Sequence, residues 1–128
     1  MKLHVILYVA DQTAATRFYT AALGYQPSLN LPGMTEFALT DGAALGLMPV
    51  AGIKRLLGDP LPDPARAAGV PRAELYLLVE EPGILHDRAL AAGAVELSPL
   101  EGRDWGDLAA YSLDPDGHVI AFARRADG

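Results

Sequence analysis

Two side chains that often take part in catalysis stand at matching places in two strand-like runs of this sequence. His4 lies in the run Leu3–Val9, and Glu74 lies in the run Ala73–Val79. Imidazole and carboxylate groups can exchange protons, hold a divalent metal ion or bind a polar group of a ligand. They can also form a buried pair with a structural role alone, so the sequence leaves these alternatives open.

Strand alternation predicts which residues share a face with these two side chains. Successive side chains of a strand point to opposite sides of a sheet, and in both runs one of the two sets is uniformly apolar. We expect the apolar sets to pack on helices and the other sets to line a site. The other sets contain, besides His4 and Glu74, the candidate ligand-binding residues Tyr8, Arg72 and Tyr76. Arg72 can bind a ligand carboxylate or neutralise Glu74.

A second carboxylate, Glu36, depends on the hairpin predicted at Asp41-Gly42. A three-residue loop puts Glu36 and Met48 on the candidate face and leaves Phe37 in the core, whereas a two-residue loop reverses this parity. We therefore expect the three-residue loop, with Met48 as an adaptable apolar wall. One alternative is an atypical divalent metal site formed by three residues: His4, Glu36 and Glu74.

The only tryptophan, Trp105, lies in a predicted loop just before a strand. Its ring can act as a platform for a ligand through stacking or cation–π contact, or it can close the core as a hydrophobic lid. The other two histidines are expected to lie outside the site. His86 falls on a predicted helix with its side chain in solvent, and His118 points away from the candidate face by parity.

An internal repeat positions these residues. The pattern in each half is β-α-β-β-β, so we predict an α+β fold. Val9 and Val79 are 70 residues apart, the helix-stopping Gly24 and Gly93 are 69 apart, and the two Asp-Gly turns are 75 apart. The predicted elements of the first half are a strand at 3–9, a helix at 12–23 and strands at 25–31, 34–40 and 44–48. Those of the second half are a strand at 73–79, a helix at 82–92 that Glu81 caps, and strands at 94–98, 109–113 and 118–123.

The two modules form one structural domain with a connection between them. We place the first module at 1–49, a linker with a short helix at 50–71, and the second module at 72–128. The short helix is predicted at 53–57, and the proline-rich run that follows it favours extended backbone.

Composition limits the classes of partner. Of the 128 residues, 51% are hydrophobic, which is enough for a packed core, and the net charge is −6. An acidic chain with no basic stripe is not expected to bind nucleic acid. The absence of cysteine removes disulfides and thiolate sites, and no apolar run reaches the length of a membrane span. A strand-like run from Leu3 leaves no room for a signal peptide, so we expect a cytoplasmic protein.

Several segments together resemble the vicinal oxygen chelate superfamily, which includes glyoxalase I, extradiol dioxygenases, fosfomycin-resistance enzymes and bleomycin-resistance proteins. The resemblance rests on LYVAD, RFYTAALGYQP, ELYLLVEEP with ALAAGA, and YSLDPDGHVIAF, which occur in the family's order and span nearly the whole chain. It implies a cup-shaped mixed sheet around a cleft and a homodimer.

The resemblance also implies four positions for the ligands of a divalent metal ion. Carried onto this sequence, these positions are His4, Gly46, Glu74 and Ala121. Glycine and alanine have no side-chain donor, so the standard metal site is expected to be absent and no cofactor is predicted.

We therefore expect a glyoxalase-like or bleomycin-resistance-like protein that binds or sequesters a small molecule. Two enzymatic alternatives stay open. One is a metal-dependent lyase, isomerase or dioxygenase that uses the atypical site described above. The other is metal-free acid–base catalysis, with Glu74 as the catalytic base and His4 tuning it.

Overall fold

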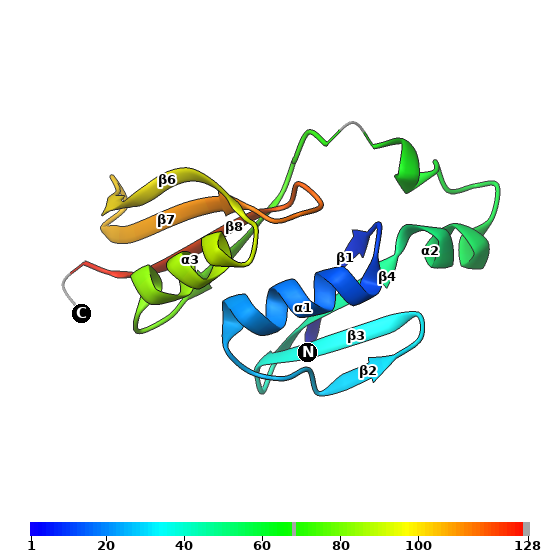
Figure 1. Cartoon of the computed structure of the whole chain (residues 1–128), viewed down its shortest axis with the longest axis horizontal. Coiled ribbons are helices and arrows are strands. Elements are labelled where there is room, and N and C mark those ends of the chain that lie inside the picture. The colour runs from blue at the N-terminus through cyan, green and yellow to red at the C-terminus, as the bar shows by residue number, and fades with distance from the viewer. Residues whose placement is uncertain (68, 127–128) are drawn as a thin grey trace. The chain divides into compact units, whose positions relative to one another are not determined.

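The computed structural model describes residues 1–67 and 69–126. Ala68, in the predicted linker, and the last two residues, in the predicted second module, lie outside the described residues. The described residues form eight strands, three α-helices and one short 3-10 helix, in the order that Figure 1 shows. They confirm the α+β class and its two β-α-β-β-β modules.

The first module forms a four-stranded sheet in the order β1-β4-β3-β2. Only the β1–β4 pair is parallel, and the other pairs are antiparallel. Its elements are β1 (Leu3–Val9), α1 (Gln12–Leu23), β2 (Leu29–Leu31), β3 (Met34–Thr40) and β4 (Ala43–Pro49). The bounds of β1 and α1 match the prediction, whereas β2 begins four residues later than predicted.

The second module repeats this topology in the order β5-β8-β7-β6, with β5 and β8 parallel. Its elements are β5 (Glu74–Leu78), α3 (Pro82–Ala91), β6 (Val95–Gly102), β7 (Asp107–Leu113) and β8 (Val119–Arg125). The strand β7 begins two residues before the predicted start, which brings Asp107 into the sheet.

The predicted linker contains α2 (Val50–Leu57) and the 3-10 helix η1 (Pro64–Arg66). The helix begins three residues before the predicted start, and Ile53 is its buried residue. Lys54 stabilises the C-terminal end of this helix, because its Nζ donates hydrogen bonds to the carbonyls of Gly58 and Leu61. None of the helices that the structure describes is long and apolar enough to span a membrane.

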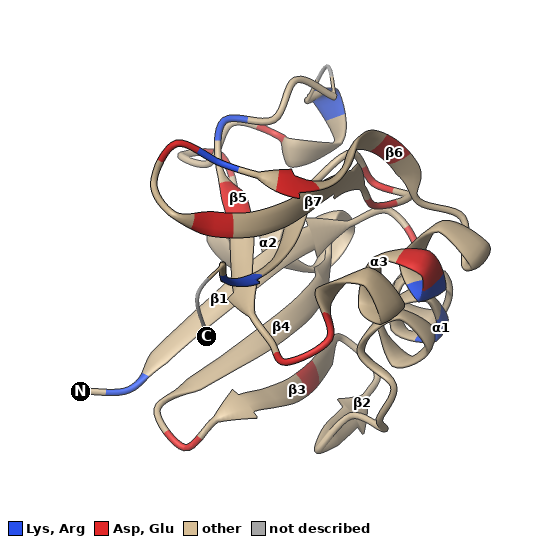
Figure 2. Ribbon diagram, turned by 90° about the vertical axis from the view of Figure 1, so that its left-hand side faces the viewer, with Lys and Arg blue, Asp and Glu red and all other residues tan. Residues whose placement is uncertain are grey.

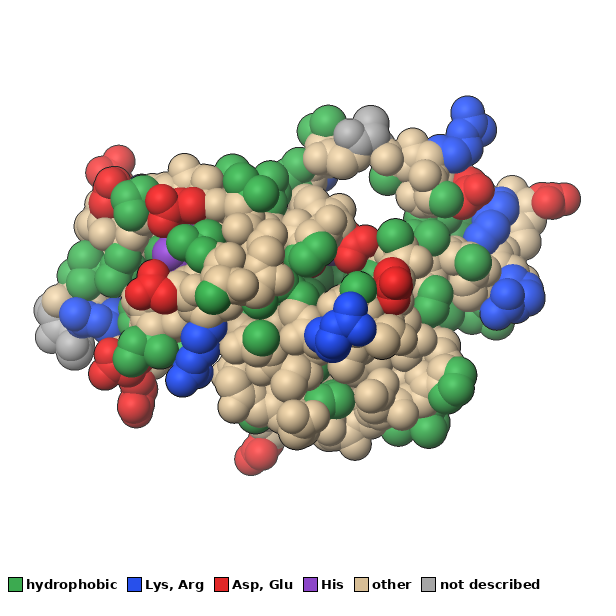
Figure 3. Space-filling model, viewed as in Figure 1, with side chains coloured by type: hydrophobic (Ala, Val, Ile, Leu, Met, Phe, Trp, Pro, Cys, Tyr) green, Lys and Arg blue, Asp and Glu red, His purple; other side chains and the backbone are tan. Residues whose placement is uncertain are grey.

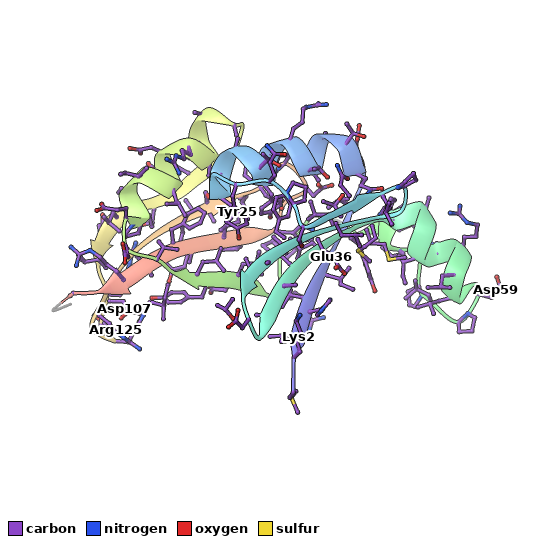
Figure 4. The ribbon with its side chains drawn as sticks, turned by 90° about the horizontal axis from the view of Figure 1, so that it is seen from below. Lys2, Tyr25, Glu36, Asp59, Asp107 and Arg125 are labelled. Carbon is purple, nitrogen blue, oxygen red and sulfur yellow. The ribbon has the colours of Figure 1, made fainter. Side chains whose placement is uncertain are left out.

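Contacts within the chain divide it into two compact units. The first consists of residues 1–20 and 25–68, and the second of residues 21–24 and 69–128. Each unit has its own sheet and its own buried core. In the first, α1 lies over one face of the sheet, and in the second, α3 packs on β7 and β8 (Figure 4).

The buried cores form where apolar strand faces meet these helices. In the first unit, Phe37 and Leu45 have no exposed surface, and the centres of the Tyr19 and Phe37 rings are 6.5 Å apart. In the second, Ile120 and Phe122 are buried on the side of α3. The opposite face of each sheet is therefore the one left to carry polar and aromatic side chains.

The hairpin between β3 and β4 differs from the prediction. Thr40 pairs with Ala43, so the loop has two residues and not three. The pairing then shifts between Ala38 and Thr40, because a β-bulge inserts one extra residue at this point. The bulge compensates for the shorter loop, so Phe37 is buried and Glu36 lies on the opposite face.

Candidate functional site

Glu36 and His4 lie side by side on the face of the first sheet opposite α1. Glu36 on β3 and Ile6 on β1 both pair with Gly46, which lies between them on β4. His4 is two residues before Ile6, so its side chain points to the same face. The His4 Nδ1 and Glu36 Oε2 atoms are 3.5 Å apart, and the two side chains are 39% and 26% exposed. Such an exposed pair contributes little to stability, and it leaves both groups open to a ligand. Figure 4 labels Glu36 on β3.

Gly46 stands in the middle of this face, and its neighbours fill the space beside it. A Cβ added at Gly46 would lie 3.0 Å from Cγ1 of Ile6 and 3.3 Å from Sδ of Met34. The site that the resemblance assigns to a metal ligand is thus covered by two apolar side chains. Tyr8 and Met48 pair farther along the same face, where Tyr8 is 37% exposed.

The equivalent row of the second sheet is aromatic. Ala121 pairs with Tyr76 on one side and with Tyr111 on the other, and it is fully buried between them. The four positions of the standard metal site therefore do not fit a four-ligand ion, because two of them lack donors and tyrosines flank Ala121. Tyr111 was not among the residues predicted from the sequence.

A chain of hydrogen bonds fixes the aromatic side chains of this face. The indole Nε1 of Trp105 donates to the hydroxyl of Tyr76 over 2.9 Å, and that hydroxyl donates to Oδ2 of Asp107 over 2.6 Å. Nη1 of Arg125 completes the chain with a 2.7 Å contact to Oδ1 of Asp107. Asp107 is only 2% exposed, whereas Trp105 is 54% exposed. Figure 4 labels Asp107 and Arg125 where β7 begins and β8 ends.

The protonation of this chain is set by the contacts within it. The hydrogen bond from Tyr76 and then the guanidinium of Arg125 hold the pKa of Asp107 below its ordinary value, against the opposing effect of burial. Burial, followed by the hydrogen bond to Asp107, raises the pKa of Tyr76. The carboxylate is therefore charged and the phenol is neutral near pH 7, which keeps the donor and acceptor roles fixed.

Tyr111 is held from one side by Arg103. The guanidinium of Arg103 lies 5.1 Å from the centre of the Tyr111 ring, within the range of a cation–π contact. Its Nη2 also donates to the Ala109 carbonyl and to Ser98 Oγ, at 2.8 and 2.7 Å. Burial and then the charge of Glu74 raise the pKa of Tyr111. Glu74 is exposed and acts on this aromatic face.

The predicted candidates are thus divided between the two units. The first unit brings together His4 and Glu36, while the second holds Glu74 with the aromatic residues. The side chains of His4 and Glu74 are both exposed within the described residues, and the alternative of a buried structural pair between them stays a prediction. Arg72 is exposed ahead of β5, and among the described residues it makes no ion pair with Glu74.

The exposed indole of Trp105 disagrees with the lid interpretation.

In the part of the chain that the structure describes, no group of three or more His, Asp or Glu side chains is placed to hold a metal ion.

In the second unit, one sequence-based expectation was wrong and two residues of the candidate site were missed. His86 was expected in solvent, yet it is 3% exposed, with Nε2 located 2.9 Å from Oε2 of Glu96. It is buried because the face of α3 that contains Pro82 and Ala89 packs on the sheet. Asp107 and Arg125 were missed, although the apolar run of β7 extends back to Leu108 and could have revealed the earlier start.

Comparisons with known proteins find a family model and solved structures that match the fold of this chain. A model of the Glyoxalase/Bleomycin resistance protein/Dioxygenase superfamily matches residues 3–122. Among functionally curated proteins, none matches the chain. Similar solved structures include a glyoxalase-related enzyme from Fulvimarina pelagi, at 26% identity and a TM-score of 0.81, with 98% of this chain and 88% of that chain covered.

Two further solved structures have the same fold at lower identity. A glyoxalase/bleomycin resistance protein/dioxygenase family enzyme from Burkholderia phytofirmans PsJN is 20% identical, with a TM-score of 0.80 and coverage of 95% and 96%. A glyoxalase/bleomycin resistance protein/dioxygenase from Nocardioides is 23% identical, with a TM-score of 0.77 and coverage of 100% and 85%.

Proposed function

The chain belongs to the Glyoxalase/Bleomycin resistance protein/Dioxygenase superfamily, and on that premise we propose that it binds a small organic molecule without using the four-ligand metal site. The observation that supports this proposal most directly is the exposed indole of Trp105, which is held against Tyr76 by a hydrogen bond. A rigid, exposed aromatic ring gives a ligand contact area at a small cost in conformational entropy.

Charge favours a cationic ligand with an aromatic group. Both arginines near the aromatic face are already engaged, Arg125 with Asp107 and Arg103 with Glu101. Glu74 is exposed and has no ion-pair partner among the described residues, so it is the available charge beside Tyr111. A ligand cation there is attracted by the carboxylate and by the faces of the rings.

Tryptophan fluorescence tests this proposal directly, because Trp105 is the only tryptophan. Benzamidinium, an aromatic cation, is expected to change the emission of Trp105 in a saturable way, whereas its anionic counterpart benzoate is not. Glu74→Gln should weaken benzamidinium binding about tenfold, as expected for the loss of an interaction between charged groups.

Glu80→Gln is the matched control, since Glu80 is an exposed carboxylate just beyond β5. It should bind benzamidinium as the parent chain does. Equal responses to benzamidinium and benzoate, or an unchanged affinity in Glu74→Gln, would rule out a cation site at Glu74. Binding of bleomycin, a molecule that the family description names, can be measured with the same protein variants.

A second candidate function, a metal-dependent lyase, isomerase or dioxygenase, is favoured by the contact between His4 and Glu36. Two of the three side chains proposed for an atypical metal site, His4, Glu36 and Glu74, are neighbours in the first unit. Elemental analysis of protein purified without chelators tests this candidate. Stoichiometric metal that is lost in His4→Ala would support it, and the absence of both bound metal and thermal stabilisation by added Ni²⁺, Mn²⁺, Fe²⁺ or Zn²⁺ would reject it.

We also propose that the chain is a cytoplasmic homodimer. Exposed apolar side chains on outer strands support an interface between copies: Leu3 on β1 is 58% exposed, and Val95 and Leu97 on β6 are 60% and 51% exposed. Such positions on a sheet edge commonly mark an interaction surface. The lack of cysteine means that no disulfide requires an oxidising compartment.

A further inference from the structure

We propose that the first unit has a second binding site, a polar pocket between α1 and the β2–β3 hairpin that takes a small oxyanion. The pocket has a volume of about 540 Å³, within the range of small-ligand sites. Its walls are the first half of α1 (Gln12, Thr13, Thr16 and Arg17) and the hairpin (Asn30 and the turn Leu31–Gly33).

This pocket is on the opposite side of the first sheet from the His4–Glu36 pair. Thr35 is fully buried toward α1, and its neighbour Glu36 points to the other face, because strand side chains alternate. The pocket is therefore separate from the site considered above.

Gln12 ties the hairpin to the helix and so fixes the shape of the pocket. Its Oε1 accepts a hydrogen bond from the backbone N–H of Gly33 at 2.8 Å, and its Nε2 donates to the Leu31 carbonyl and to Thr35 Oγ1 at 2.8 and 2.9 Å. Three contacts from a single amide hold the two walls together before a ligand arrives. A site with walls fixed in this way loses little entropy on binding.

The buried hydroxyl of Thr35 determines which groups are left for a ligand. It accepts from Gln12, contacts Thr16 Oγ1 at 2.9 Å and donates to Oδ1 of Asn30 at 3.0 Å. Because Oδ1 is the acceptor, the Asn30 side chain has its NH₂ group left over, with no partner among the described residues. The pocket therefore has an amide donor beside the exposed hydroxyl of Thr13.

Charge selects an anion for this pocket. Arg17 is exposed, and within the described chain it makes no ion pair, so its five N–H donors are available. No aspartate or glutamate lines the pocket, although the chain has 16 of them. The nearest in sequence, Asp11, accepts a hydrogen bond from the backbone of Ala14. Figure 3 shows a mostly uncharged surface over α1 and the hairpin, with both basic (blue) and acidic (red) side chains near the start of α1.

These donors match the acceptor oxygens of a carboxylate or a phosphate. A guanidinium binds two oxygens of such a group in a bidentate manner, and the hydroxyl and amide donors can take the remaining lone pairs. The ring of Pro32 and the side chain of Leu31 offer a short apolar wall for the body of the ligand.

Amide NMR titration with inorganic phosphate and with succinate, at constant ionic strength against chloride, tests the pocket. We expect saturable shifts of the Gly33 backbone amide and of the Asn30 side-chain amide, and the tighter of the two anions identifies the class of ligand. Arg17→Gln should weaken binding at least about tenfold, as for a lost hydrogen bond between charged groups. Thr13→Val should weaken it less.

Arg55→Gln is the matched control, because Arg55 is an exposed arginine on α2 of the same unit and is outside the pocket. It should retain the parent affinity, and so should Trp105→Ala, which separates this result from that of the aromatic site. Shifts that rise linearly without saturation, or equal losses in Arg17→Gln and Arg55→Gln, would overturn the proposal.

Discussion

Asp107 is the residue on which the order of the second sheet face depends. Its buried carboxylate accepts from Tyr76 and pairs with Arg125, and Tyr76 in turn positions the indole of Trp105. A buried carboxylate is stable only when its oxygens have partners. The exposed ring of Trp105 is thus supported by a buried charge at the start of β7.

The low pKa of Asp107 predicts a specific dependence of stability on pH. Since the folded pKa is below the ordinary value of 3.8, the carboxylate contributes fully above that value. The contribution is lost as the pH falls through the folded pKa. The free energies of unfolding of the parent chain and of Asp107→Asn should therefore differ most near neutral pH and converge in acid.

Urea denaturation followed from about pH 7 down to about pH 3 measures this difference. Asp59→Asn, at an exposed aspartate after α2, should leave the profile of the parent chain unchanged. A difference for Asp107→Asn that stays constant over the whole range would contradict the assignment.

The hydroxyl of Tyr76 is expected to restrict the motion of Trp105. Tyr76→Phe removes the acceptor for the indole N–H and one donor to Asp107, which should cost about 1 kcal/mol of stability. It should also speed the local motion of the indole, as measured by the time-resolved fluorescence anisotropy of this single tryptophan. Tyr111→Phe is the control, and equal anisotropy decays in the two variants would show that the hydrogen bond does not hold the ring.

At the scale of elements, the centre of each open sheet face is set by three neighbouring strands. The rows Ile6–Gly46–Glu36 and Tyr76–Ala121–Tyr111 occupy equivalent places in β1-β4-β3 and β5-β8-β7. A small residue in the middle strand allows the side chains from both neighbours to close over it. One topology therefore presents a mixed apolar and acidic surface in one unit and an aromatic surface in the other.

Crowding around Gly46 gives a test at this scale. Gly46→Ala should cost about 1 kcal/mol, because the new methyl group meets Ile6 and Met34 more closely than ordinary packing allows. Much of that cost should disappear in the background Ile6→Ala, which removes the nearest atom. Thermal melts of the four chains of this double-mutant cycle measure the coupling.

Gly42→Ala is the control for the same chemical change, since an added Cβ there meets no atom within 4 Å. It should be tolerated better than Gly46→Ala. Additive effects of Ile6→Ala and Gly46→Ala would show that Ile6 does not fill the space beside Gly46.

At the scale of the whole molecule, charge and exposed apolar strands define the expected partners. The 16 acidic residues outnumber the 10 basic ones, and Figure 2 shows them spread over strands, turns and helices. This distribution does not favour binding to nucleic acid, whose phosphates require a basic surface. The apolar residues on β1 and β6 favour contact with a second copy of the chain instead.

Sedimentation equilibrium tests the proposed homodimer. The mass should be twice the 13.5 kDa of the chain at micromolar concentrations. Leu97→Glu, which places a charge on the exposed face of β6, should shift the equilibrium toward the monomer, whereas Leu56→Glu, on exposed α2, should not. A monomeric mass for the parent chain would contradict the proposal.

The sequence by itself determined the elements and their duplication, because these depend on local patterns. The β-rich apolar run Leu3–Val9, the apolar stripe of Gln12–Leu23 and the glycine after it can each be recognised from a short stretch of sequence. The face on which Glu36 lies also followed from the need to bury Phe37. The predicted loop was one residue too long, but the β-bulge restores the register, so Phe37 is still buried and Glu36 still points to the opposite face.

Only the tertiary structure decided the contacts that build the candidate sites. Tyr76 is 31 residues from Asp107 and 29 from Trp105, and they meet because β8 pairs with both β5 and β7. Gln12 reaches Gly33 across the packing of a helix on a hairpin. Such partners are fixed by strand order and helix packing, which bring distant segments together, and local periodicity carries no information about which of them will touch.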